Sequence, residues 1–294
     1  MKTTISRRQF LRTTAVAGAA VVLAPRLPAQ AAPKMTVREL LALMKTKHGV
    51  TWNEESYRDT VKAGNIDTPV TGVASTFMST LDVLQRAKAA GTNFVVTHEP
   101  TFWSDPDTIT DAVFDDPLFR LKRDFVEKNN MVVWRNHDHW HLFRPDPFST
   151  YQNKVLGWEQ FVTASGGRNY RFPPTKVKVL ADQIARRLES RSVRIIGDPE
   201  QVVSIVGRGG HALDQNMRAL AGDLDAIVVS EAREVDSIEY VRDLNAAGVK
   251  KPLILVSHQT GEEAGMTAFA EWLPTLVPGI KVVNIKTTDQ MWIG

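Results

Sequence analysis

Three stretches of this sequence run from apolar residues directly into side chains that can bind metal ions. Each apolar run is short and bounded by polar residues, a pattern typical of a buried strand, so the ligand-type side chains would lie at the strand ends. Five of the seven histidines fall at these ends. Imidazole and carboxylate donors without cysteine are the ligand set of zinc, manganese, iron or nickel. The candidate metal ligands are His98, Glu99, His137, Asp138, His141, His258 and Glu262.

The spacing of these residues suggests how they could face one site. His137, His139 and His141 alternate, so an extended chain would place them on one face and Asp138 on the other. His258 and Glu262 are four positions apart, so a helix starting there would place both on one face.

We consider Glu231 and His139 candidate catalytic groups, because a carboxylate or imidazole that does not bind metal can move a proton. Glu231 could equally be an ordinary acid at the start of a helix. Any single histidine at a strand end could instead be a hydrogen-bonded loop residue.

One or two divalent ions at such a site, zinc, manganese or iron, would lower the pKa of a bound water and polarise a carbonyl or phosphoryl oxygen. The pattern therefore predicts a metal-dependent hydrolase with a mono- or dinuclear centre that acts on a small phosphoester or cyclic amide. The alternative is a non-catalytic metal-binding or interaction protein. A third interpretation is a carbohydrate or nucleotide binder that stacks its ligand on Trp103, Trp134 and Trp140.

The first 31 residues predict export. Residues 6–11 (SRRQFL) form a twin-arginine pattern, an apolar stretch follows at 13–24, and residues 29–31 (AQA) form a cleavage site. The apolar stretch is shorter than the roughly 20 residues that span a membrane. We therefore expect the mature protein to be periplasmic or secreted. The absence of cysteine means that it has no disulfides.

Processing also changes the charge of the chain. The whole sequence has a net charge of +3, but residues 1–31 contain five basic residues and no acid. The mature chain has 31 basic and 33 acidic residues, a net charge of −2. This balance argues against nucleic acid or an anionic membrane as a partner and favours a small-molecule substrate.

Helical and strand patterns alternate along the chain, which predicts an α/β fold with mixed or parallel sheets covered by helices. We expect two lobes, 32–165 and 166–294, with the metal site between them at the carboxyl ends of strands. The last strand could return to the first lobe. Predicted helices cover 36–47, 80–90, 117–128, 148–158 and 175–189. Predicted strands cover 69–75, 94–97, 131–134, 193–196, 202–206, 226–230, 253–256 and 280–285.

The boundary between the lobes is expected at residues 164–171, where Gly, Ser and Asn gather without apolar periodicity. A second glycine-rich segment, residues 207–211 (GRGGH), leads from a strand into a helix. Such a turn can hold an anion on its exposed N–H groups. It matches neither a P-loop nor a dinucleotide-binding pattern, so we interpret it as a tight structural turn.

Several of these motifs resemble the Nif-three-like dinuclear-metal-centre family, also called type-two GTP cyclohydrolase I-like. The similarity extends over nearly all of the mature chain. It is carried by residues 70–75 (VTGVAS) through 91–100 (GTNFVVTHEP), 229–234 (VSEARE) and 257–262 (SHQTGE).

The resemblance implies metal-binding roles for His98, His137, His258 and Glu262 directly. It implies such roles for Glu99 and His141 by position only, because the family has a histidine at the first of these and an aspartate at the second. It also implies a homo-oligomer, a toroidal hexamer. The family name suggests opening of the GTP ring, but export argues against a nucleoside triphosphate as the substrate.

Overall fold

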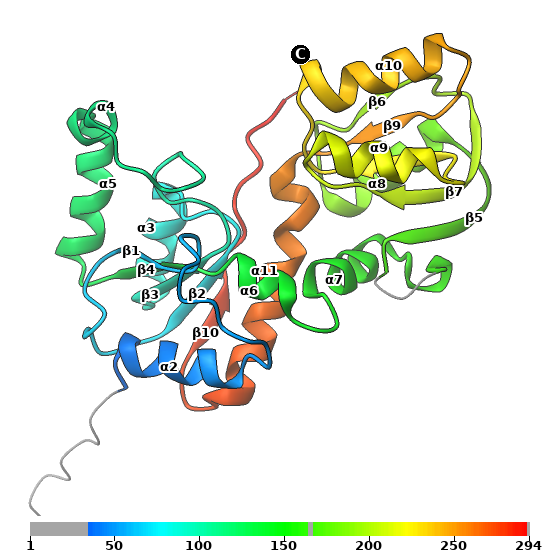
Figure 1. The fold of residues 1–294 in the computed structure, drawn as a ribbon. Helices are drawn as coiled ribbons and strands as arrows, with labels where there is room; N and C mark the ends of the chain where they lie inside the picture. Colours follow the sequence, from blue (N-terminus) through cyan, green and yellow to red (C-terminus); the bar gives the residue numbers. More distant parts are fainter. Residues whose placement is uncertain (1–34, 164–166, 293–294) are drawn as a thin grey trace, which may run out of the picture. The chain divides into compact units, whose positions relative to one another are not determined.

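A computed structural model describes residues 35–163 and 167–292 of the chain. The predicted signal peptide lies outside the described residues. The fold is α/β, with two five-stranded sheets covered by helices (Figure 1). This confirms the predicted fold class.

The first sheet has the strand order β1-β4-β3-β2-β10. Its four strands from β4 to β10 run parallel, and β1 joins the edge antiparallel to β4. Every residue of β2, β3 and β4 is buried, which explains their continuous apolar runs. The strands are β1 Val61–Ala63, β2 Val73–Thr76, β3 Phe94–Thr97, β4 Val132–Arg135 and β10 Val282–Asn284.

The second sheet has the order β5-β7-β8-β9-β6, with the three central strands parallel and both edges antiparallel. β5 begins at Asn169, inside the segment that we expected to separate the lobes. The boundary itself, near residue 165, falls on residues outside the description and remains a prediction. The strands are β5 Asn169–Lys176, β6 Arg194–Ile196, β7 Val202–Arg208, β8 Ala226–Val229 and β9 Leu253–Leu255.

Most helices begin at the capping residues that the sequence provides. Thr36 and Glu39 form a capping box at the start of α2, and Asp116 caps α5 ahead of a proline in its first turn. The helices are α2 Val37–Lys47, α3 Leu81–Ala89, α4 Asp111–Asp115, α5 Pro117–Lys128, α6 Asp138–Leu142, α7 Pro147–Leu156, α8 Val177–Leu188, α9 Leu213–Ala221, α10 Glu239–Ala246 and α11 His258–Leu276, with short turns η1 Glu159–Phe161 and η2 Glu234–Ile238.

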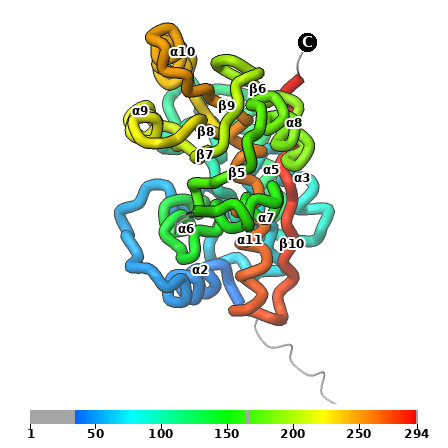
Figure 2. Tube along the Cα trace, turned by 90° about the vertical axis from the view of Figure 1, so that its right-hand side faces the viewer, coloured from blue at the N-terminus to red at the C-terminus, as the bar shows by residue number. Residues whose placement is uncertain are grey.

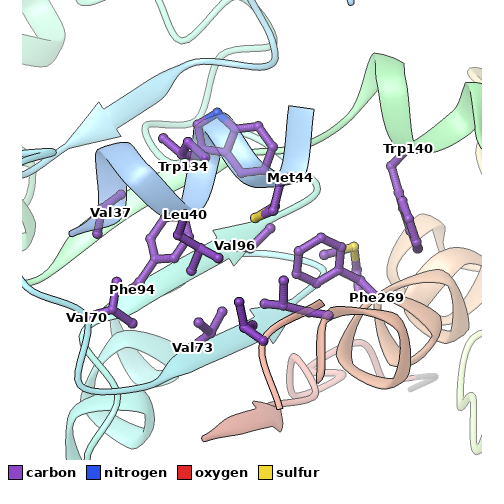
Figure 3. Close-up of a cluster of buried hydrophobic side chains, with 14 of the residues drawn as sticks. Val37, Leu40, Met44, Val70, Val73, Phe94, Val96, Trp134, Trp140 and Phe269 are labelled. Carbon is purple, nitrogen blue, oxygen red and sulfur yellow. The ribbon is translucent and has the colours of Figure 1, made fainter. Parts of the chain in front are cut away.

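The core of the first sheet lies between its strands, α2 and α11 (Figure 3). Leu40 and Met44 of α2 pack over Phe94 and Val96 of β3, and Phe269 of α11 closes the same cluster. Burial of a side chain of this size stabilises the fold by roughly 1.5–3 kcal/mol. This packing fixes the position of β3, whose end carries His98 and Glu99.

Helix α11 connects the second sheet to the first. It packs against α7 and also against β2 and β10 of the first sheet, while its first residues follow β9 of the second sheet (Figures 1 and 2). β10 pairs in parallel with β2, so the C-terminal part of the chain lies beside the first sheet. Within residues 35–163 and 167–292, no helix combines the length and the apolar character that a membrane crossing needs.

Candidate metal centre

His98 and Glu99 follow directly from β3 and face other ligand-type groups. His98 is fully buried, and its Nδ1 lies 3.1 Å from the carbonyl oxygen of Asn136, to which it donates when protonated. Its Nε2 has no hydrogen-bond partner among the described residues and lies 3.6 Å from Glu262 and 3.8 Å from Glu99. This nitrogen is therefore free to bind a ligand from the side of the two carboxylates.

Glu99 is held by Arg135, the last residue of β4. The Nη2 of Arg135 donates to Oε2 of Glu99 at 3.1 Å. The other oxygen, Oε1, lies 3.7 Å from Nε2 of both His137 and His258. One oxygen is thus paired and the other points toward imidazoles.

His137 and His141 lie on one turn of helix, not on an extended chain. The short helix α6 starts at Asp138, so positions four apart share a face and His139 turns elsewhere. The rings of His98 and His137 stack with centroids 4.4 Å apart, and His141 lies 4.9 Å from both. Burial, with the neighbouring imidazoles, lowers the pKa of His137 and also that of His141, so both rings are neutral and able to bind metal at pH 7.

A buried aspartate that the sequence analysis missed fixes this turn. Asp59 accepts hydrogen bonds from the backbone N–H groups of His137, Asp138 and His139 and also contacts the ring of His139. The carboxylate thereby satisfies backbone donors that the start of a helix leaves open. The contact joins residues about 80 positions apart, which no local pattern reveals.

His258 and Glu262 come from the first turn of α11, which Ser257 caps. Nε2 of His258 lies 3.0 Å from Oε2 of Glu262, while its Nδ1 lies 2.9 Å from Glu231. Burial opposes the charge on His258, but the hydrogen bonds to Glu231 and Glu262 outweigh it and raise the pKa of this histidine to about 10.

The structure adds His211, which the sequence analysis placed in a structural turn. Its Nε2 lies 3.4 Å from Oε1 of Glu262 and 2.9 Å from the hydroxyl of Ser230. Burial opposes the charge of Glu262, but hydrogen bonds from His211, His258 and His98 together lower its pKa well below the usual value. The glycines before His211 suggested a turn that can hold an anion, but nothing in their pattern indicated that His211 lies beside Glu262.

The side chains that face one another form a histidine and glutamate cluster: His98, Glu99, His137, His141, His211, His258 and Glu262. Two predicted site residues lie outside this cluster. His139 is buried against Asn53, whose N–H donates to its Nε2 at 2.7 Å, and stacks on Trp52 with centroids 3.6 Å apart. Both of its ring nitrogens are engaged, so the structure does not support the predicted catalytic role. Asp138 contacts Nδ1 of His137 at 2.9 Å and Arg58 at 3.3 Å, a position that orients His137 and does not face the other donors.

The interpretation of three tryptophans as a stacking surface is also corrected. Trp134 and Trp140 are almost fully buried in the core. Trp103 alone of the three is exposed, with 54% of its surface accessible. A ligand could therefore stack on Trp103 only.

The donor atoms fit a metal ion. Three groups have ligand atoms within 4.8 Å of one another: His98, His137 and His141; His98, Glu99 and Glu262; and His211, Glu231 and His258. Two donors bound at about 2.1 Å to a tetrahedral ion lie roughly 3.4 Å apart. The distances of 3.0–3.8 Å among these imidazoles and carboxylates match that spacing. These groups could therefore bind a metal ion.

Known proteins share the fold of this chain. A hypothetical protein of Staphylococcus aureus is 17% identical, with a TM-score of 0.68, and the match covers 88% of this chain and 99% of that one. A Bacillus cereus protein related to NIF3 is 11% identical, with a TM-score of 0.70 and coverage of 90% and 100%. HcgD from Methanocaldococcus jannaschii, in its reduced form, is 14% identical, with a TM-score of 0.61 and coverage of 85% and 97%.

Comparison by sequence covers both the signal and the rest of the chain. No curated protein matches the chain. A twin-arginine translocation signal matches residues 4–24, which indicates export. The sequence model of Duf34/NIF3 (NGG1p interacting factor 3) matches residues 35–290, almost the whole mature chain. With its two-sheet fold and its histidine and glutamate cluster, this chain belongs to the Duf34/NIF3 family.

Proposed function

We propose that the mature protein is a metal-dependent hydrolase that acts outside the cytoplasm on a small phosphoester or cyclic amide. The observation that supports it most is that donor atoms from both sheets converge and remain accessible. Glu99 and His258 line a cavity of about 300 Å³ together with Trp103, Leu118 and Lys122. A catalytic metal site keeps a coordination position open for substrate, whereas a structural site is closed.

Each side chain has a defined task in this proposal. His98, His137 and His141 would hold one ion, and Glu99, His258 and Glu262 would hold a second. One or two divalent ions, zinc, manganese or iron, would supply Lewis-acid polarisation and a more acidic water.

The surrounding residues orient these ligands. Asp138 holds His137 through its Nδ1 and Glu231 holds His258 through its Nδ1, which leaves both Nε2 atoms facing the cluster. Glu231 is half-exposed, so it can also exchange a proton with solvent or substrate. The hydrogen bond from His258 lowers the pKa of Glu231, so it is ionised at neutral pH and can accept a proton.

The activity of metal-loaded mature protein on a panel of phosphomonoesters, phosphodiesters and cyclic amides tests the proposal. We expect hydrolysis of one class, which disappears in His98→Ala together with the metal. Glu231→Gln should lower kcat roughly 10–100-fold because His258 loses its orienting partner. Glu234→Gln, an exposed acid at the start of η2, is the matched control and should leave kcat unchanged.

Fully metal-loaded protein that hydrolyses nothing in the panel would contradict the hydrolase. That result would favour the alternative, a non-catalytic metal-binding or interaction protein of the same family. The hexamer implied by the family resemblance remains a prediction in either case.

A further inference from the structure

Arg208, the last residue of β7, has a buried guanidinium group with few protein partners. Its Nη2 donates a hydrogen bond to the hydroxyl of Ser149 at 2.8 Å. Its Nε and Nη1 are buried and have no partner among the described residues. The three N–H donors on Nε and Nη1 are therefore unused.

The charge of Arg208 is also uncompensated at short range. Within the described part of the chain no carboxylate forms an ion pair with it, and Asp146 and Glu262 act on it only from a greater distance. Burying a cation without an anionic partner is unfavourable, because the interaction with water is lost and nothing replaces it. Arginine stays protonated in proteins, so relief requires an acceptor or an anion.

Two cavities share Arg168 in their lining, and each also has one residue of the histidine and glutamate cluster in its wall. The smaller has a volume of about 30 Å³ and is lined by Arg208, Arg168, Gln152, Ser230 and Glu262. That volume accommodates a group of the size of one oxygen atom or water. An oxygen placed there lies between a cluster carboxylate and two guanidinium groups.

The larger cavity, of about 880 Å³, gives room for the rest of a ligand. Its lining includes His141 of the cluster together with Arg144, Arg168, Ser149 and Asp146. Ser149 donates to Asp146 at 2.6 Å and receives hydrogen bonds from Arg168 and Arg208. Asp146 lies 3.6 Å from Arg168, so the one acid in this group is already partnered by a cation.

We propose that Arg208, with Arg168 and Ser149, forms a subsite that binds an oxyanion of the ligand, a phosphate or a carboxylate, next to the metal-binding cluster. Guanidinium groups are well suited to such anions because their planar N–H donors match the oxygens. That the ligand is a substrate rests on the proposed hydrolase activity. The binding of an anion at this subsite does not depend on that activity. The subsite narrows the substrate class to molecules that carry an anionic group within reach of the cluster.

Calorimetric titration of the metal-loaded mature protein with inorganic phosphate, and separately with acetate, tests the subsite. We expect saturable binding of at least one of the two anions. Arg208→Met should weaken it roughly tenfold or more, since hydrogen bonds to a charged group are lost. The matched control Arg171→Met, an exposed arginine of the neighbouring strand β5, should bind as the wild type does.

Phosphate could also bind to a metal ion, so a second arm uses His98→Ala. Retained phosphate binding in this variant and its loss in Arg208→Met support the arginine subsite. Loss in His98→Ala with unchanged binding in Arg208→Met overturns the proposal, even when the hydrolase proposal holds. Absence of any anion binding by the wild type overturns it as well.

Stability provides a control for the fold of the variant. Replacing an uncompensated buried charge with an apolar side chain of similar length should not lower Tm in phosphate-free buffer. Phosphate should then raise the Tm of the wild type and leave that of Arg208→Met unchanged.

If Arg208→Met does not fold, Arg208→Lys provides a second test, because it retains the charge without the planar donors. It should show the same weakened phosphate binding. Wild-type affinity for phosphate in Arg208→Lys would contradict the proposal.

Discussion

At the scale of single residues, the cluster differs in the order of its donors from the pattern that the resemblance implied. Position 99 carries a carboxylate where the resemblance implied an imidazole, and position 141 carries an imidazole where it implied a carboxylate. Both side chains nevertheless lie beside His98. The two positions together still provide one imidazole and one carboxylate, so their combined charge is the same as in the pattern that the resemblance implied.

Asp59 gives a test of how the turn with His137 and His141 is positioned. Asp59→Ala removes the acceptor of the backbone N–H groups of His137, Asp138 and His139. Buried donors left unpaired should lower the free energy of unfolding by about 3 kcal/mol. The loosened turn should also lower metal affinity about 10–100-fold. Urea unfolding and metal titration measure the two effects.

Asp67→Ala is the matched control, because Asp67 forms an exposed ion pair with Arg38. Its effect on the free energy of unfolding should stay within about 1 kcal/mol. An Asp59→Ala protein that binds metal as tightly as the wild type would show that Asp59 serves stability alone.

The site residues that could be predicted from the sequence are those at the ends of apolar runs. His98, His137, His141, His258 and Glu262 follow strands or start helices, and the structure brings them together. Their metal-binding role remains a prediction. Asp59 and His211 were missed because their contacts depend on tertiary structure. His139 was misplaced because α6 replaces the extended chain on which the alternation argument depended.

At the scale of elements, buried parallel strands and capped helices were the most predictable. The apolar run of β3 and the caps of α2 and α5 set the limits of these elements within about one residue. The edge strands β1 and β5 were not predicted. β1 is short and half-buried, and β5 contains Pro173 and Pro174 at an irregularity in its pairing, so neither shows the usual strand pattern.

Helix α5 carries a buried lysine whose titration should be visible in stability. Lys122 donates to the carbonyl of Thr101 and lies over the rings of Phe102 and Trp103. Burial lowers its pKa to about 8, although Asp107 opposes this. In the unfolded chain the pKa is about 10.4, so between these values the folded protein binds fewer protons than the unfolded one.

The free energy of unfolding should therefore rise with pH through this window because of Lys122. A pKa shift of this size lowers the free energy of unfolding by about 3 kcal/mol below pH 8, and this destabilisation disappears as the pH rises to about 10.4. Urea unfolding of the wild type and Lys122→Met at pH 7, 8.5 and 10 measures the difference in slope. Lys128→Met, at the exposed end of the same helix, should keep the wild-type slope. Equal slopes for wild type and Lys122→Met would contradict the assignment.

At the scale of the whole molecule, two sheets supply donors to one cluster through their parallel strands. β3 and β4 of the first sheet lead to His98 and His137, and β9 of the second leads into α11 and His258. The close approach of α11 to β8 depends on Gly261, where a Cβ atom would lie 2.4 Å from the Cβ of Ser230. The sequence predicted ligand-bearing strand ends and a metal site between two lobes, and the fold places donor side chains from both sheets within 4 Å of one another.

The metal content of the mature protein tests the central claim most directly. Elemental analysis of wild type expressed with its signal should find about one to two transition-metal ions per chain, because the donors are preformed by the fold. His98→Ala and His258→Ala should each lose bound metal, while His48→Gln, at a buried histidine outside the three donor groups, should retain it. Wild type without metal, or both cluster variants with full metal, would contradict the claim.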